Sequence, residues 1–398
     1  MTLPSADLDL FSDAALADPY PVYAALRDLG PAVFLSRHDA WFLGRHTEVR
    51  QALSDWKTFS SAQGIGLNPI INAAWANALI CVDPPRHTAM RKLITDRLGP
   101  AQIRGVEETI DRRAQQLVEQ LAQRGRFEAV RDLAYDLPIN VIMDLVGWPH
   151  EVRGEVLQLA EGGFDACGPA NGKMQASLPR LQRMMQLIES VYDAGTLIPG
   201  GFGSTIADAA RRGEIPREVA IGMLAGYVVA AFDTTISAMA SGIWLFAQHP
   251  DQWDRVRADP DLVPRACQEI IRMESPIQMF SRVATRDVDF GEGITMPAGA
   301  RAIVCYASAN RDERQFPDAD RFDVSRHPNA HLGFGMGNHS CAGQSLARLE
   351  LHAVFGALAR RVERIEIDGE PRLAPHQVIR SFADRKSTRL NSSHRMPS

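Results

Sequence analysis

The chain of 398 residues has only five cysteines, which are widely spaced and form no C-x-x-C pair. This argues against a disulfide framework or a zinc ribbon and favours a reducing, cytoplasmic location. Positive charge is not in excess, because 43 Lys and Arg stand against 48 Asp and Glu, a formal net charge of −5. We therefore expect neither nucleic acid nor an anionic membrane as a partner.

The N-terminus lacks a basic stretch followed by a long apolar run, so no signal peptide or membrane anchor is expected there. One internal segment, 219–247, is apolar or small apart from Asp233, Thr234, Thr235 and a few serines. A helix over 217–248 would be roughly 48 Å long, enough to cross a bilayer. A charge at its middle is costly in lipid, so we favour the alternative, a helix at the centre of a large soluble protein.

Helical periodicity dominates after residue 83, which predicts a mainly α-helical fold with a minor β region. One large domain over 1–383 fits this pattern better than separable units. The expected helices cover 47–54, 104–124, 176–197, 217–248 and 342–358. The expected strands are a pair within 32–43 and a small meander within 283–304. Residues 60–82 are rich in Gly, Asn, Ala and Pro and are expected to form a long loop.

The strongest chemical signal is F-G-M-G-N-H-S-C-A-G over 334–343. Its glycines let the backbone turn tightly and approach a flat ligand. Cys341 opens the expected helix, where the helix dipole and the first N–H groups favour a thiolate. A glycine loop with an ordinary buried cysteine is the alternative. The full pattern F-G-x-G-x-H-x-C-x-G, however, resembles the haem-binding loop of the cytochrome P450 family.

That resemblance implies a P450 fold with a long central helix over a buried haem b, whose iron is bound by Cys341. Phe334, Gly335, His339 and Gly343 are the implied neighbours of the cofactor in this loop. A thiolate ligand favours O–O bond cleavage, so the implied activity is that of a monooxygenase using dioxygen.

A second segment, A-A-F-D-T-T at 230–235, resembles the oxygen-activating stretch of the same family. Ala231 replaces the usual glycine but is small enough to let the helix pass close to the haem. The resemblance implies that Asp233 and Thr234 deliver protons to bound dioxygen. Taken alone, a mid-helix threonine is more often a residue that bonds back to the i−4 carbonyl.

Two further segments follow the family's order. In D-P-P-R-H-T-A-M-R, His87 and Arg91 share one helix face and, with Arg282 and His339, are the implied partners of the haem propionates. The E-x-x-R pair lies one turn apart on a helix, and the resemblance gives it a structural role with a later arginine. These structural residues are Glu269, Arg272 and Arg321.

The resemblance covers nearly the whole chain and is closest to bacterial P450s that oxidise para-substituted benzoates. It implies an apolar, aromatic pocket for a small flat ring. The implied lining is Leu67, Trp75, Leu79, Phe164, Val229, Ala230, Thr234, Ile277 and Phe280. Cys167 stands where those relatives have an aromatic residue, which should enlarge the pocket.

The groups with which those relatives hold a carboxylate are missing. Gly226 replaces a serine, the loop 75–78 reads W-A-N-A, and no Arg or Lys lies between Lys57 and Arg86. A buried carboxylate without such partners is unfavourable by several kcal/mol. We therefore expect a neutral or weakly polar aromatic substrate, such as an alkyl- or methoxyphenol, that is hydroxylated or O-demethylated.

The chain has no flavin or iron–sulfur motif, so a ferredoxin and its reductase are the expected electron donors. Arg360, Arg361 and Arg364 could form a basic docking surface, although such helical charge runs are normally only solvated. Two other functions stay open: a biosynthetic P450 for oxidative coupling or rearrangement, and a haem-binding sensor or carrier without turnover.

Residues 384–398, D-R-K-S-T-R-L-N-S-S-H-R-M-P-S, have no apolar period, although the family would place a final strand here. The string resembles the translation of a common sequencing adapter. We expect a non-native, loosely packed tail and a missing strand, whose partner would become an open edge. A natural disordered tail is the alternative.

Overall fold

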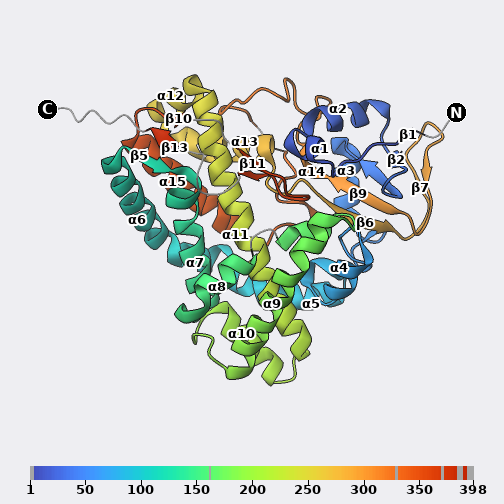
Figure 1. Cartoon of the computed structure of the whole chain (residues 1–398), viewed down its shortest axis with the longest axis horizontal. Helices are drawn as coiled ribbons and strands as arrows, with labels where there is room; N and C mark the ends of the chain where they lie inside the picture. The colour runs from blue at the N-terminus through green and yellow to red at the C-terminus, as the bar shows by residue number, and fades with distance from the viewer. Residues whose placement is uncertain (1–3, 161–162, 328–329, 369–371, 383–388, 392–398) are drawn as a thin grey trace.

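The computed structural model describes residues 4–160, 163–327, 330–368, 372–382 and 389–391. Helices make up most of the molecule, and a smaller β-rich part lies beside the N-terminus (Figure 1). The predicted mainly α-helical fold with a minor β region is therefore confirmed. The helices before the central one are α1 (Asp13–Ala17), α2 (Tyr20–Leu29), α3 (His46–Ser54), α4 (Pro69–Ala74), α5 (Arg86–Leu98), α6 (Pro100–Arg124), α7 (Asp136–Val146), α8 (His150–Ala160), α9 (Gly172–Ala194) and α10 (Phe202–Arg211). The central and later helices are α11 (Arg217–Gln248), α12 (Pro250–Ala258), α13 (Val263–Glu274), α14 (Tyr306–Ala309) and α15 (Gln344–Arg361).

The main sheet has six strands and joins the start of the chain to residues near 300. In spatial order they are β1 (Ser5–Ala6), β2 (Val33–Leu35), β3 (Ala40–Leu43), β9 (Arg301–Cys305), β6 (Met279–Ala284) and β4 (Phe59–Ser60). The pair β2–β3 places Phe34 opposite Trp41, and β6 is buried along its whole length. The predicted strand pair is present. The segment predicted as a meander forms strands but is paired differently, because β6 pairs with β9 and encloses a separate hairpin of β7 (Val288–Asp289) and β8 (Thr295–Met296).

Helix α11 begins and ends at the predicted residues and runs through the core. It packs on helices from both halves of the chain, among them α7, α9, α10, α13 and α15. It is long and apolar enough to cross a membrane, but 67% of its most apolar window is buried within the fold. This burial is that of a core helix, as the charge at its centre indicated.

Two expectations need correction. The segment 60–82 is not a loop throughout, because it contains α4 and the 3-10 turn η1 (Leu79–Cys81). Asn68 starts α4 by accepting a hydrogen bond from the Ile71 N–H at 3.0 Å, and Pro69 occupies the first helical position. An Asn-Pro pair is a helix-start signal that the loop-like composition of the segment concealed.

The tail is the second correction. Residues Arg389–Asn391 form β13, which lies between β10 (Glu366–Asp368) and β5 (Arg126–Glu128) and pairs antiparallel with both. The expected absence of a strand is therefore wrong for these three residues, and the rest of 384–398 lies outside the described residues. Main-chain hydrogen bonds do not depend on side-chain identity, so two open strand edges can accept almost any extended segment.

Candidate active site

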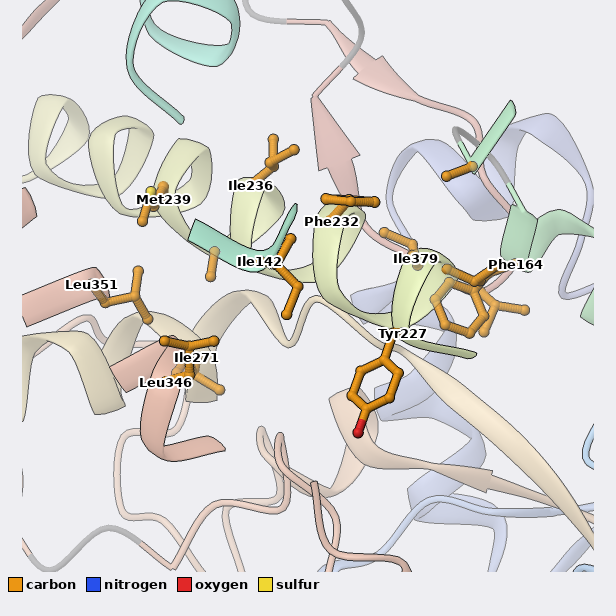
Figure 2. Packing of buried hydrophobic residues seen from close by; sticks show 14 of the residues in the cluster. Ile142, Phe164, Tyr227, Phe232, Ile236, Met239, Ile271, Leu346, Leu351 and Ile379 are labelled. Carbon is orange, nitrogen blue, oxygen red and sulfur yellow. The ribbon is translucent and has the colours of Figure 1, made fainter. Parts of the chain in front are cut away.

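A cavity of about 500 Å³ lies at the centre of the molecule, between α11 and the loop that carries Cys341. Its walls are largely apolar and come from α5, α9, α11, α15 and β6. Part of its lining is seen in Figure 2, which includes Tyr227, Phe164, Ile271 and Leu346. The size and character of the lining are those of a ligand site.

The Cys341 loop keeps its shape through glycine. Gly335 and Gly337 have φ values of +66° and +68°, in the left-handed region that favours glycine. A Cβ on Gly337 would lie 2.5 Å from the carbonyl oxygen of Leu53, so a side chain there would displace the loop from α3. The Cys341 N–H closes the loop by donating to the Phe334 carbonyl at 2.8 Å.

Opposing effects act on the Cys341 thiol. Burial raises its pKa, while the N–H groups of Gly343 and Gln344 and the charges of Arg91 and Arg348 lower it. Helix α15 begins at Gln344 and not at residue 342, so Cys341 lies just before the helix. Its sulfur still receives the first N–H groups, as the motif predicted. A metal ion would convert such a thiol into the bound thiolate.

Four side chains able to bind anions line the cavity on the Cys341 side: His87, Arg91, Arg282 and His339. The two imidazole rings lie 4.4 Å apart, and the Nε2 atoms of both are buried without a hydrogen-bond partner among the described residues. Burial lowers the pKa of His339 to about 3, with neighbouring positive charges adding to the effect. Buried polar atoms are normally paired, so the carboxylates of a haem fit this set.

The residues expected to take part in dioxygen activation lie on α11. Ala230, Ala231 and Thr234 line the cavity, whereas Asp233, next to Thr234, is half-buried and does not line it. The Thr234 hydroxyl donates to the Ala230 carbonyl at 2.9 Å. The threonine therefore bonds back within its helix, and the same residue lines the cavity; its expected role in proton delivery stays a prediction.

Eight of the nine expected pocket residues line the cavity: Trp75, Leu79, Phe164, Val229, Ala230, Thr234, Ile277 and Phe280. Phe164 is the centre of an aromatic group, with its ring 6.3 Å from Trp75 and 5.7 Å from Phe280. The Phe164 ring is inclined by 80° to Trp75 and by 49° to Phe280, so the three rings form an aromatic wall of edge-on and tilted contacts.

Leu67 is placed differently. Together with Cys167 it lines a separate space of about 10 Å³ instead of the main cavity. The reason is a contact between two segments that are far apart in the sequence. The Leu67 N–H donates a hydrogen bond to the Cys167 carbonyl at 2.8 Å and so holds these segments together. Cys167 therefore does not enlarge the main cavity.

The buried ion pair behind the site differs in one partner from the expectation. Glu269 and Arg272 are both fully buried and joined by two hydrogen bonds of 2.7 and 2.8 Å. The later arginine that reaches Glu269 is Arg326, at 3.1 Å, and not Arg321. Arg321 contributes its carbonyl oxygen, because its own side chain is turned outward and exposed.

Several cavity residues were not found from the sequence, notably Tyr227, Tyr306 and Glu350. Tyr227 lies seven residues before Thr234 and therefore on the same helix face, which is the one signal that could have indicated it.

Comparison with known proteins gives a consistent answer. The family model described as Cytochrome P450 matches residues 222–377. Cytochrome p450 CYP199A2 of Rhodopseudomonas palustris is 36% identical, covering 92% of this chain and 90% of that protein. Linalool 8-monooxygenase of Pseudomonas putida is 31% identical, and the match covers 89% of this chain and 91% of that protein. Among solved structures, ligand-free CYP164A2 of Mycobacterium smegmatis is 26% identical, with a TM-score of 0.85. The match covers 96% of this chain and 98% of that chain.

Proposed function

Since the chain belongs to the cytochrome P450 family and is a monooxygenase that uses haem b and dioxygen, we propose that it oxidises a small, neutral aromatic compound. The reaction is hydroxylation or O-demethylation, with electrons from a ferredoxin and its reductase.

Cys341 is the iron ligand in this proposal, and His87, Arg91, Arg282 and His339 hold the haem carboxylates. The support is the pair of buried imidazole nitrogens in the cavity lining, which have no hydrogen-bond partner in the part of the chain that the structure describes. Haem with a thiolate ligand supplies dioxygen activation when it is bound. The chain's own part is to hold a proton at the Thr234 oxygen, with Asp233 on the adjoining helix position as its link toward solvent. Thr234→Ala should then consume NADH with less product formed.

The observation that carries the substrate class is the distribution of charge along the cavity. Arg91 and Arg282 lie with the histidines on the Cys341 side, where the haem carboxylates require them. The far end is lined by Glu189, Arg217 and Glu218, and the start of α11 lies roughly 25 Å from Thr234 at 1.5 Å per residue.

Arg217 is the cation among those three, and its guanidinium already bonds both oxygens of Asp193 at 2.7 and 3.2 Å. A carboxylate substrate would therefore pass Glu189 and Glu218 and then enter an aromatic pocket without a cation of its own. Leaving a charge unpaired in such surroundings costs several kcal/mol, whereas burying a neutral phenol hydroxyl without a partner costs only about 1–3 kcal/mol.

The test compares two ligands that differ in one substituent, 4-methoxyphenol and 4-methoxybenzoate. Displacement of water from the haem iron shifts the Soret band, so titration gives both dissociation constants. We expect the phenol to bind at least tenfold more tightly, and formaldehyde to be released with the demethylated product in step with NADH use. Tighter binding of the benzoate would refute the neutral substrate class.

The ferredoxin proposal rests on Arg360, Arg361 and Arg364, which are all exposed. Two of them are engaged with acidic neighbours, Arg361 with Glu119 and Arg364 with Glu366, each at 3.0 Å. Exposed pairs of this kind are weak and can be exchanged for a partner's carboxylates. Arg360→Glu should reduce the rate of ferredoxin-dependent haem reduction at low salt, and no effect would place the docking surface elsewhere.

A further inference from the structure

Tyr227 has a buried hydroxyl group that the site described above does not use. The residue is 9% exposed, and its hydroxyl oxygen is buried without a hydrogen-bond partner among the described residues. Buried tyrosine hydroxyls usually find a partner, because leaving one unpaired costs on the order of 1–3 kcal/mol. Figure 2 shows the ring directed away from the α11 backbone, with the hydroxyl at its far end.

The direction of this hydroxyl is fixed by packing. The Tyr227 ring lies against Phe202 of α10, with 6.3 Å between the ring centres and 35° between their planes. Tyr227 lines the cavity on the same helix face as Thr234, roughly 10 Å away along the axis at 1.5 Å per residue. Tyr227 and Thr234 therefore contribute to the cavity lining from one face of α11, about two turns apart.

The charges around Tyr227 indicate what the hydroxyl faces. Burial raises the pKa of Tyr227, and the positive charge of Arg91 acts in the opposite direction. Arg91 in turn is close enough to Cys341 and to His339 to influence the pKa of each. Tyr227 thus lies within electrostatic reach of Arg91 and lines the same cavity as the cationic and imidazole side chains, where a neutral donor and an arginine can share one anion.

We propose that the Tyr227 hydroxyl donates a hydrogen bond to the haem carboxylate that Arg91 binds. Tyr227 is then a fifth haem-carboxylate partner, contributed by the central helix, and it links the helix that carries Thr234 directly to the cofactor. A phenol suits this place better than another cation, because it adds a donor without adding charge to a cluster that already contains Arg91, Arg282 and two histidines.

The test replaces Tyr227 with Phe, which keeps the ring contact with Phe202 and removes only the hydroxyl. The matched control is Tyr192→Phe, a buried tyrosine on α9 that does not line the cavity. Haem transfer from each purified holoprotein to apomyoglobin gives the rate of cofactor loss. Resonance Raman spectra give the propionate bending band, which responds to hydrogen bonding at the carboxylates.

For Tyr227→Phe we expect haem loss at least about tenfold faster, since the variant lacks a hydrogen bond to a charged carboxylate and a tenfold change corresponds to about 1.4 kcal/mol. The propionate band should shift, ligand dissociation constants should change less than twofold, and the control should match the parent protein. Unchanged haem loss with an unchanged band would overturn the proposal. In that case, altered ligand dissociation constants would show that the hydroxyl contacts the substrate. Unaltered dissociation constants would show that it contacts neither the substrate nor the haem carboxylate.

If Tyr227→Phe incorporates little haem, circular dichroism distinguishes weaker cofactor binding from loss of the protein fold. If Tyr227→Phe is purified largely without haem but has the helix content of the haem-free parent, the loss is one of cofactor affinity, as proposed. If helix content is lost relative to that parent, the hydroxyl supports the protein fold itself, which contradicts the proposal.

Discussion

The pH dependence of stability should be controlled in part by one buried carboxyl group. Glu350 of α15 is 3% exposed and lines the inner cavity, and its Oε1 has no hydrogen-bond partner among the described residues. Burial raises the pKa of Glu350 from 4.5 to about 8. The folded protein therefore keeps this group protonated at neutral pH, where the unfolded chain has released the proton.

The sign and size of the effect follow from this difference. Because the folded-state pKa is the higher one, stability is fully present below pH 4.5 and is lost as pH rises toward 8. Each pH unit in that window corresponds to about 1.4 kcal/mol. Between pH 5 and 8 the loss is about 4 kcal/mol at most, and water entering the cavity would reduce it to about 2 kcal/mol.

The variant Glu350→Gln keeps the shape and cannot ionise, so it should not show this loss. For a chain of this length, 1 kcal/mol changes the Tm by roughly 1–2 °C. The difference in Tm between the variant and the parent should therefore be about 2–8 °C larger, in favour of the variant, at pH 8 than at pH 5. Differential scanning fluorimetry of both proteins between pH 5 and pH 8 measures this difference in Tm. Glu363→Gln, an exposed glutamate, is the control. A Tm difference that stays constant with pH would refute the reasoning.

Three further outcomes test the site and its support. Cys341→Ser should abolish the red-shifted Soret band of the carbon monoxide complex of the reduced protein, and retention of that band would exclude Cys341 as ligand. Gly337→Ala brings a Cβ to 2.5 Å from the Leu53 carbonyl at φ +68° and should cost at least about 1–3 kcal/mol, seen as lower haem occupancy and Tm. Arg326→Gln should lower stability by about 1.5–3 kcal/mol in urea unfolding because it removes one charged hydrogen bond from Glu269, which keeps its pair with Arg272, whereas Arg321→Gln should change it by less than about 1 kcal/mol.

The features that could be predicted from the sequence are those specified by local pattern. The bounds of α11 follow from Pro216 and from a long run of mostly small and apolar residues, interrupted chiefly at 233–235, and both ends agree with the structure. The Cys341 loop is specified in the same way, because its glycines and cysteine lie within ten consecutive residues and their conformation depends on few distant contacts.

The residues misplaced or missed depend on contacts between distant segments. Leu67 is in an aligned position, but its backbone is tied to Cys167, a hundred residues later, and turns into a separate space. Arg321 and Arg326 lie five residues apart in one irregular segment, and only the path of that segment past Glu269 decides which guanidinium is buried. Tyr227 is an ordinary apolar residue of α11 until the positions of Arg91 and the cavity are known.

Near the end of the chain, one stretch is held in place by particular side chains and the next by main-chain hydrogen bonds. Up to Phe382 the chain is held by particular side chains: Arg380 pairs with the buried Glu274, and Asp165 accepts hydrogen bonds from the Gln377 N–H at 2.7 Å and from His376 at 2.8 Å. Strand β13, in contrast, is defined by main-chain pairing with β5 and β10, for which almost any extended tripeptide would serve. Since Asp165 adjoins Phe164 in the aromatic wall, it is the specified stretch before residue 383 that connects the C-terminal region to the active site.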